Sequence, residues 1–112
     1  MAGNYPRYRV SKNIEVRLAP QIGVMGCEFR HLVRAFGNPP LSTDYGDEFD
    51  GVEKCAWHIE FETGHVAKIC DVRPFGIHDI DYRTVKEWRV NGHDERVYEW
   101  IKERIRDANP NE

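Results

Sequence analysis

The stretch from Cys55 to Val72 restricts the fold of this chain more than any other part of the sequence. Large apolar residues occupy every second position from Trp57 to Phe61, which is the spacing of a β-strand with one buried face. The alternation resumes after Thr63-Gly64, a pair that suits a tight turn. These residues are therefore predicted to form a β-hairpin over about 53–72.

The length of the turn decides which side chains share a face of the hairpin. A two-residue loop at Thr63-Gly64 would turn Ile69 outward beside His58. A three-residue loop, with Gly64 in a left-handed conformation, instead pairs Trp57 with Ile69. We prefer the longer loop because it gathers the large apolar side chains on one face, and a slip of one residue would reverse the faces of a strand. The buried face is then Trp57, Ile59, Phe61, Ala67 and Ile69, and the outer face is His58, Glu60, Val66 and Lys68.

Two helices are predicted on either side of the hairpin. The first, over about 27–36, carries apolar residues at positions i, i+3, i+4 and i+7 and ends at Gly37. A strand over about 85–91 precedes the second helix, over about 95–107, for which Asp94 is a suitable N-cap. The apolar residues of this last helix are Val97, Tyr98, Trp100, Ile101 and Ile105.

The N-terminal region looks extended at residues 8–10 and again at residues 13–19. Apolar and charged residues alternate in the second segment, which is therefore predicted to be an edge strand that ends at Pro20. The expected fold class is α+β, with a small antiparallel sheet covered on one face by the two helices. The sheet would consist of the hairpin, the strand over 85–91 and a possible N-terminal strand.

The whole chain of 112 residues is expected to form one domain with loose ends at residues 1–6 and 108–112. We find neither an apolar run long enough to span a membrane nor a signal peptide. Three cysteines fit free thiols in a reducing compartment. The preferred register also places Cys55 and Cys70 on opposite faces, which argues against a disulfide between them.

Two long connections, Leu41–Gly51 and Arg73–Thr84, adjoin the same end of the hairpin and are expected to lie together. Loops of this length in a compact domain usually have a function. Aromatic anchors inside an acidic rim favour binding to a basic protein, or to a site that normally takes nucleic acid. The alternative is that the aromatic residues turn inward and cap the core. The candidate partner-binding residues are Asp44, Tyr45, Asp47, Glu48, Phe49, Asp50, Phe75, Ile77, Asp79, Asp81 and Tyr82.

A second candidate site is the basic N-terminal arm, which consists of Arg7, Arg9, Lys12 and Arg17. Together with nearby tyrosines, such residues could neutralise phosphates and stack on bases of a nucleic acid. They could equally dock the arm on the acidic remainder of the chain. Residues 1–40 carry a net charge of +4 and residues 41–112 a net charge of −7, so neither half is basic enough to indicate nucleic-acid binding by charge alone. Binding of a small nucleotide is a third alternative, although no glycine-rich phosphate loop supports it.

Metal and catalytic sites have little support in the sequence. The acids from Asp44 to Asp50 lack the spacing and central glycine of an EF-hand, which favours a solvated loop. The five histidines lack the helical pair or Cys-x-x-Cys partner that is typical of zinc sites. His58 is expected to be a solvated residue on the outer sheet face. We therefore expect no metal, no cofactor and no catalytic residues.

Three short motifs, taken in order, resemble small and mostly uncharacterised accessory proteins of tailed bacteriophages. They are Phe-Gly-x-Pro at residues 36–39, Trp-x-Ile-x-Phe-x-x-Gly-x-Val-Ala-x-Ile at 57–69 and Trp-x-Val-x-Gly at 88–92. The resemblance covers about residues 27–107, and departs from the family at Thr63, where Asp is usual, and at Cys70, where Tyr is usual. It implies a phage setting and no reaction. The leading hypothesis is a phage protein that binds and modulates a bacterial host protein in the host cytoplasm, as an inhibitor or anti-defence factor.

Overall fold

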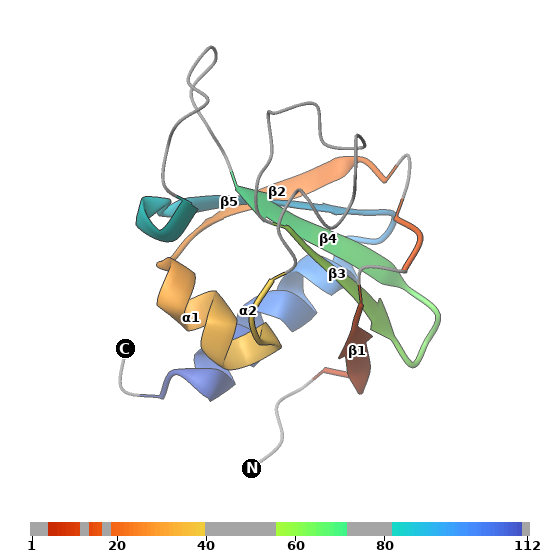
Figure 1. Ribbon diagram of the computed structural model, residues 1–112. Helices are drawn as coiled ribbons and strands as arrows, with labels where there is room; N and C mark the ends of the chain where they lie inside the picture. The colour runs from red at the N-terminus through yellow and green to blue at the C-terminus, as the bar shows by residue number, and fades with distance from the viewer. Residues whose placement is uncertain (1–4, 12–13, 17–18, 40–55, 72–81, 111–112) are drawn as a thin grey trace.

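The computed structural model describes residues 5–11, 14–16, 19–39, 56–71 and 82–110 (Figure 1). Within these residues the chain forms a five-stranded antiparallel sheet and two α-helices, which confirms the expected α+β class. The elements in chain order are β1 (Tyr8–Val10), β2 (Gln21–Gly26), α1 (Phe29–Phe36), β3 (Ala56–Phe61), β4 (Val66–Asp71), the 3₁₀ turn η2 (Tyr82–Thr84), β5 (Glu87–Gly92) and α2 (Arg96–Ala108).

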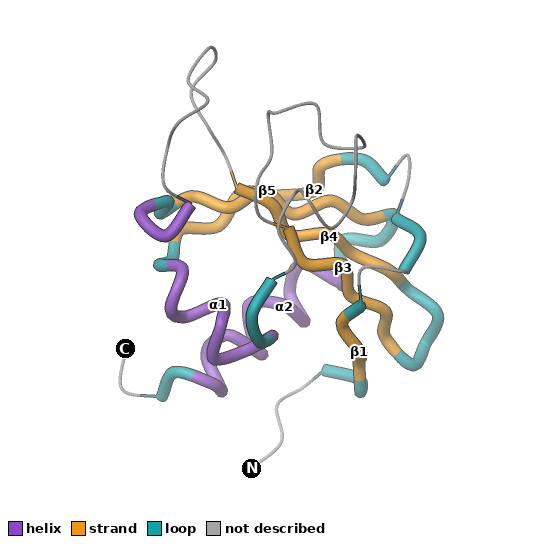
Figure 2. The backbone as a smooth tube through the Cα atoms, in the orientation of Figure 1, coloured by secondary structure: helices purple, strands orange, loops and turns teal. Residues whose placement is uncertain are grey.

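The strands are ordered β1-β3-β4-β5-β2 across the sheet, and every neighbouring pair is antiparallel. The hairpin of β3 and β4 therefore lies in the interior of the sheet, while β1 and β2 form its two edges. Both helices lie on the same side of the sheet and pack against each other (Figures 1 and 2). We call this side the helix face and the opposite side the second face.

The hairpin adopts the register expected from the three-residue loop. Trp57 pairs with Ile69 across β3 and β4. The Phe61 N–H donates to the His65 carbonyl at 2.8 Å, and Gly64 has a φ of 93°, a left-handed conformation that glycine adopts without strain. All five predicted apolar residues of the hairpin are buried, each 2% exposed or less.

Helix α1 ends as the sequence predicts and begins two residues later than expected. Gly37 has a φ of 86°, and its N–H donates to the Val33 carbonyl at 2.8 Å. At the start of the helix the Glu28 N–H donates to Nδ1 of His31 at 3.0 Å, which satisfies a backbone group that the helix itself leaves unpaired. These two ends fix a short helix whose buried residues are Leu32, Ala35 and Phe36.

Helix α2 supplies the other half of the helix layer. Val97 and Ile101 are fully buried, and the remaining apolar residues expected on this side, Tyr98, Trp100 and Ile105, pack against the core while partly exposed. The N-cap position is Glu95, one residue after the predicted Asp94, but the Asp94 carboxylate accepts the backbone N–H of Arg96 at 2.9 Å. In β5 both Trp88 and Val90 are fully buried.

The prediction of a strand over residues 13–19 is wrong. Ile14 to Val16 and Ala19 are not in a strand, and the strands on either side are β1 and β2. The Ile14 side chain is buried, but its N–H donates locally to the Ser11 carbonyl at 3.2 Å instead of to a neighbouring strand. Pro20, expected to end a strand, instead precedes β2, and its carbonyl accepts the Gly92 N–H at 2.8 Å.

The expectation that His58 is solvated is also wrong, because the connection between β1 and β2 covers part of the second face. His58 is 8% exposed, and its Nδ1 lies 3.1 Å from the Ile14 carbonyl oxygen. Farther along the same connection, the Ala19 carbonyl accepts the side-chain amide of Asn91 in β5 at 3.0 Å. The described parts of this connection thus contact β3 at one end and β5 at the other, which removes His58 from solvent.

Candidate functional site

Most of the predicted partner-binding residues lie outside the described residues. Of that set only Tyr82 has a described backbone, at the start of η2. The proximity of the two long connections, and the direction of their aromatic side chains, therefore stay predictions. The residues outside the described part are Asp44, Tyr45, Asp47, Glu48, Phe49, Asp50, Phe75, Ile77, Asp79 and Asp81, together with Lys12 and Arg17 of the basic arm.

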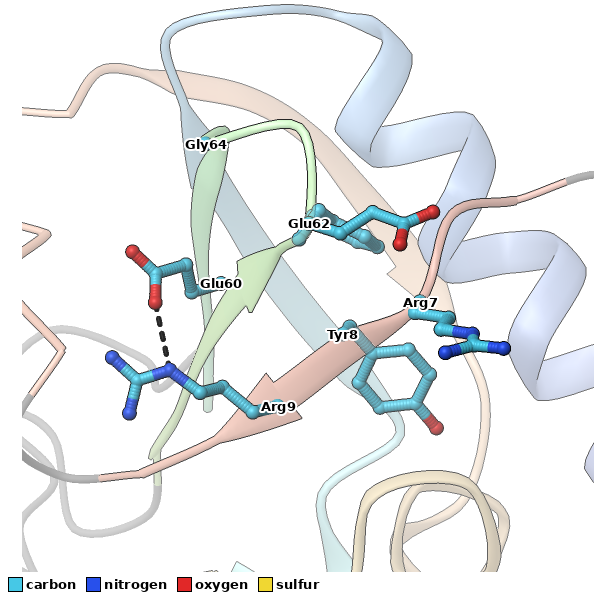
Figure 3. A pocket seen from close by; sticks show the side chains of 7 residues that line it. Arg7, Tyr8, Arg9, Glu60, Glu62 and Gly64 are labelled. Atoms are coloured by element: carbon cyan, nitrogen blue, oxygen red, sulfur yellow. Dashed lines mark hydrogen bonds and ion pairs between the residues drawn. The ribbon is translucent and has the colours of Figure 1, made fainter.

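The other two residues of the basic arm lie on or beside the edge strand β1 and line an open pocket of about 470 Å³. Figure 3 shows the pocket with β1 in front and β3 behind it, and with the Arg7 and Arg9 side chains extending to opposite sides of β1. The lining residues are Arg7, Tyr8, Arg9, Glu60, Phe61, Glu62 and Gly64.

The charges of the pocket balance one another. Nε of Arg9 donates to Oε1 of Glu60 at 2.7 Å, and the two side chains are 65% and 37% exposed. Glu62 lies next to Arg7, because its backbone N–H donates to the Arg7 carbonyl at 2.8 Å. Two guanidinium groups therefore share the pocket with two carboxylates. A groove that follows a phosphate backbone needs an excess of positive charge, which this lining does not supply.

The backbone of β1 presents hydrogen-bonding groups along the edge of the sheet. The Arg7 carbonyl accepts the N–H of Glu62, the residue after β3, at 2.8 Å. The Ser11 N–H donates to the carbonyl of His58 in β3 at 3.1 Å. Antiparallel pairing alternates residues that face the partner strand with residues that face away from it. The N–H and C=O groups of Tyr8 and Val10 must therefore point away from β3, toward the side of β1 that has no strand neighbour among the described residues.

Tyr8 fastens this edge to the helix layer. Its hydroxyl donates to the Ala35 carbonyl near the end of α1 at 2.9 Å. Its ring lies 5.6 Å from that of Phe36 and 6.1 Å from that of Phe61, measured between ring centroids. Burial raises the pKa of the Tyr8 phenol above its ordinary value, so the hydroxyl remains a donor at neutral pH. The edge strand is therefore short but held in place by a partly buried side chain.

A network of polar side chains joins the hairpin turn to the start of α2. Nδ1 of His65 lies 2.7 Å from the Thr63 hydroxyl, and its Nε2 lies 3.1 Å from Oδ2 of Asp94. Arg96 donates to the same carboxylate at 2.7 Å and lies over the ring of Trp100, 5.7 Å from its centroid. The side-chain hydrogen bond from Arg96 holds the pKa of Asp94 well below its usual range, so the carboxylate is charged throughout the physiological range.

The order hydroxyl, imidazole and carboxylate in this network resembles that of a nucleophilic triad. Here, however, Thr63 and His65 belong to one tight turn, where a hydroxyl commonly bonds a group two residues away. The Asp94 carboxylate is also committed to the first backbone N–H of α2. We therefore interpret the network as a structural clasp between the turn and the helix. It was missed in the sequence because Asp94 and His65 are brought together only by the pairing of β4 with β5.

Two of the cysteines, Cys27 and Cys70, lie in the described part of the chain. The thiol of Cys27 has a pKa raised to about 11 by burial and by the neighbouring Glu28 carboxylate, so little thiolate is present at neutral pH. Cys70 is fully buried. In the part of the chain that the structure describes, no three His, Cys, Asp or Glu side chains gather as a metal site would require.

Comparison with known proteins adds nothing to this description. No protein-family model, no curated protein and no solved structure matches the chain. Neither described helix has the length and apolar character needed to cross a membrane. The resemblance to phage accessory proteins therefore stays a prediction from the sequence motifs.

Proposed function

We propose that the protein binds another protein by accepting an extended segment of it along the outer edge of β1. The observation that carries the proposal is the direction of the Tyr8 and Val10 backbone groups, which face the side of β1 opposite β3. A peptide that adds a strand to a sheet edge obtains its affinity from such groups, and its specificity from the side chains beside them. The pocket at this edge supplies those side chains.

The charge pattern indicates what kind of segment would fit. Arg9 is already paired with Glu60, whereas Arg7 is exposed and has no ion-pair partner among the described residues. A partner segment with an acidic residue beside Arg7 and apolar residues against the edge would complement this surface. The balanced charges of the pocket favour a protein over a nucleic acid, since nucleic-acid binding depends on a net positive surface.

The biological setting rests on the sequence motifs. Their resemblance to accessory proteins of tailed phages suggests a bacterial host protein as the partner and the host cytoplasm as the location. A non-catalytic protein of this kind would act by occupying a surface of its target, as an inhibitor or anti-defence factor does. Strand addition suits that role because it needs no catalytic group.

Replacement of Val10 by proline tests the proposal. Proline removes one backbone donor on the free side of β1, and proline is tolerated on edge strands where the N–H does not bond within the sheet. The matched control is Val10→Ala, which loses the same packing against the core and keeps the N–H. Both variants would be compared with the unchanged protein in pull-downs from nuclease-treated bacterial lysate, followed by affinity measurement with the purified partner.

We expect Val10→Pro to weaken binding to the partner by about tenfold or more, and Val10→Ala to change it little, while both remain folded by circular dichroism. Equal binding by the unchanged protein and by a folded Val10→Pro variant would refute strand addition at β1. Capture that is lost on nuclease treatment, and that falls steeply with salt, would instead support the nucleic-acid alternative.

A further inference from the structure

The second edge of the sheet, formed by β2, differs from β1 in charge. Gln21 to Gly26 contains no Lys, Arg, Asp or Glu, whereas natural edge strands commonly use charges to prevent pairing with other chains. Val24 is 43% exposed and is, among the described residues, the large hydrophobic side chain that is exposed to solvent. The edge is thus uncharged and carries an apolar side chain at its centre.

The hydrogen bonds of β2 define which of its groups face outward. The Cys27 N–H donates to the Lys86 carbonyl at 3.1 Å, and Met25 pairs with Trp88 and Gly23 with Val90. By the alternation of antiparallel pairing, the N–H and C=O groups of Val24 and Gly26 point away from β5. These two residues lie beyond the register irregularity that interrupts the pairing between Gln21 and Gly23.

One side chain of α2 reaches this edge. The Tyr98 hydroxyl donates to the Val24 carbonyl at 3.1 Å, and the Tyr98 ring lies directly over Gly23, where an added Cβ would be only 2.5 Å from the ring. A carbonyl oxygen has two lone pairs, so the phenol leaves room for a second donor. Beside it, Lys102 lies 4.5 Å from the Tyr98 ring centroid and pairs with Glu99 at 3.3 Å, so the surroundings carry both signs of charge.

From this geometry we infer that β2 pairs with β2 of a second copy of the chain, antiparallel across a two-fold axis near Val24. The argument for a second copy is electrostatic and steric. An uncharged strand meets itself without like-charge repulsion, whereas β1 would bring the arginines at positions 7 and 9 of both copies together. Val24 would cover its symmetry mate and remove apolar surface from water. Closed two-fold pairing is also the commonest way in which identical chains associate.

Replacement of Val24 by lysine tests the inference, because it places two ammonium groups opposite each other at the axis. Val24→Thr is the matched control, since threonine keeps the branched shape and adds no charge. The mass in solution would be measured by light scattering and sedimentation over a wide range of protein concentrations. We expect the unchanged protein and Val24→Thr to rise from the monomer mass of 13.1 kDa toward twice that value. Val24→Lys should associate at least about tenfold more weakly.

Amide hydrogen exchange locates the interface independently. The amides of Val24 and Gly26 should become protected as the protein concentration rises, while Val10→Pro should leave association unchanged because it alters the other edge. A protein that remains monomeric at every concentration would overturn the inference. So would a folded Val24→Lys variant that dimerises as tightly as the unchanged protein, or a dimer in which the Val24 amide exchanges at the monomer's rate. None of these outcomes bears on binding of a partner at β1.

Discussion

Truncation of Trp57 should be the most damaging single change in the core. Its side chain is fully buried, with the rings of Trp88 and Phe29 at 5.6 and 6.0 Å between centroids. Its Nε1 also donates to the Gly37 carbonyl at 2.9 Å, which links the hairpin to the end of α1. Trp57→Ala should therefore lower the free energy of unfolding by about 3–5 kcal/mol, the usual cost of deleting a buried large aromatic side chain.

The Trp57→Phe variant tests the loss of the indole hydrogen bond separately from the cavity that Trp57→Ala creates. Phenylalanine keeps an aromatic ring in the core and removes the indole N–H that donates to the Gly37 carbonyl. This variant should lose about 1–2 kcal/mol, from one hydrogen bond and a smaller ring. Trp57→Phe should thus be clearly less destabilising than Trp57→Ala.

Urea unfolding followed by circular dichroism measures these differences without relying on tryptophan fluorescence. Trp100→Ala is the matched control, because Trp100 is only partly buried, on the side of α2 that faces the hairpin turn. We expect this control to cost clearly less than Trp57→Ala. A loss below about 1 kcal/mol for Trp57→Ala would refute its place at the centre of the core.

Two further predictions concern the edge strand β2 and the start of α2. Gly23→Ala should destabilise the fold by about 1–3 kcal/mol in urea unfolding, because the new methyl group displaces the Tyr98 ring, whereas Gly26→Ala, whose Cβ would be 3.8 Å from its nearest neighbour, should be close to neutral. Comparable losses at both positions would contradict this packing argument. Asp94→Asn should destabilise the protein at neutral pH, because the hydrogen bond from Arg96 lowers the folded-state pKa of Asp94. A carboxylate whose pKa is lowered in the folded state stabilises the fold above its unfolded pKa of about 3.9, and this stabilisation is lost as the pH falls toward the folded pKa. In thermal unfolding, the difference in stability between the unchanged protein and Asp94→Asn should therefore shrink below about pH 4. A difference independent of pH would assign the role of Asp94 to something other than its charge.

The sequence by itself determined the hairpin and the C-terminal end of the first helix. Alternation along β3 and β4, together with a glycine at position 64, leaves only one register that buries the apolar residues together, and that register is present. Gly37 likewise marks the end of α1, because a left-handed residue stops a helix locally. Both features depend on neighbours in the sequence, which is why the pattern of residues was sufficient.

Only the tertiary structure decided the strand β2, the burial of His58 and the clasp at the hairpin turn. The sequence of β2, which contains Gly23 and Gly26, shows no strand pattern. It forms a strand because it pairs with β5, and the Tyr98 ring packs over Gly23 where a Cβ would clash. His58 is buried because the connection between β1 and β2 crosses to the second face. These features arise between residues that are distant in the chain. These features are stabilised by contacts that form only when the chain folds. Such contacts cannot be predicted from the local alternation of residues or from their propensities.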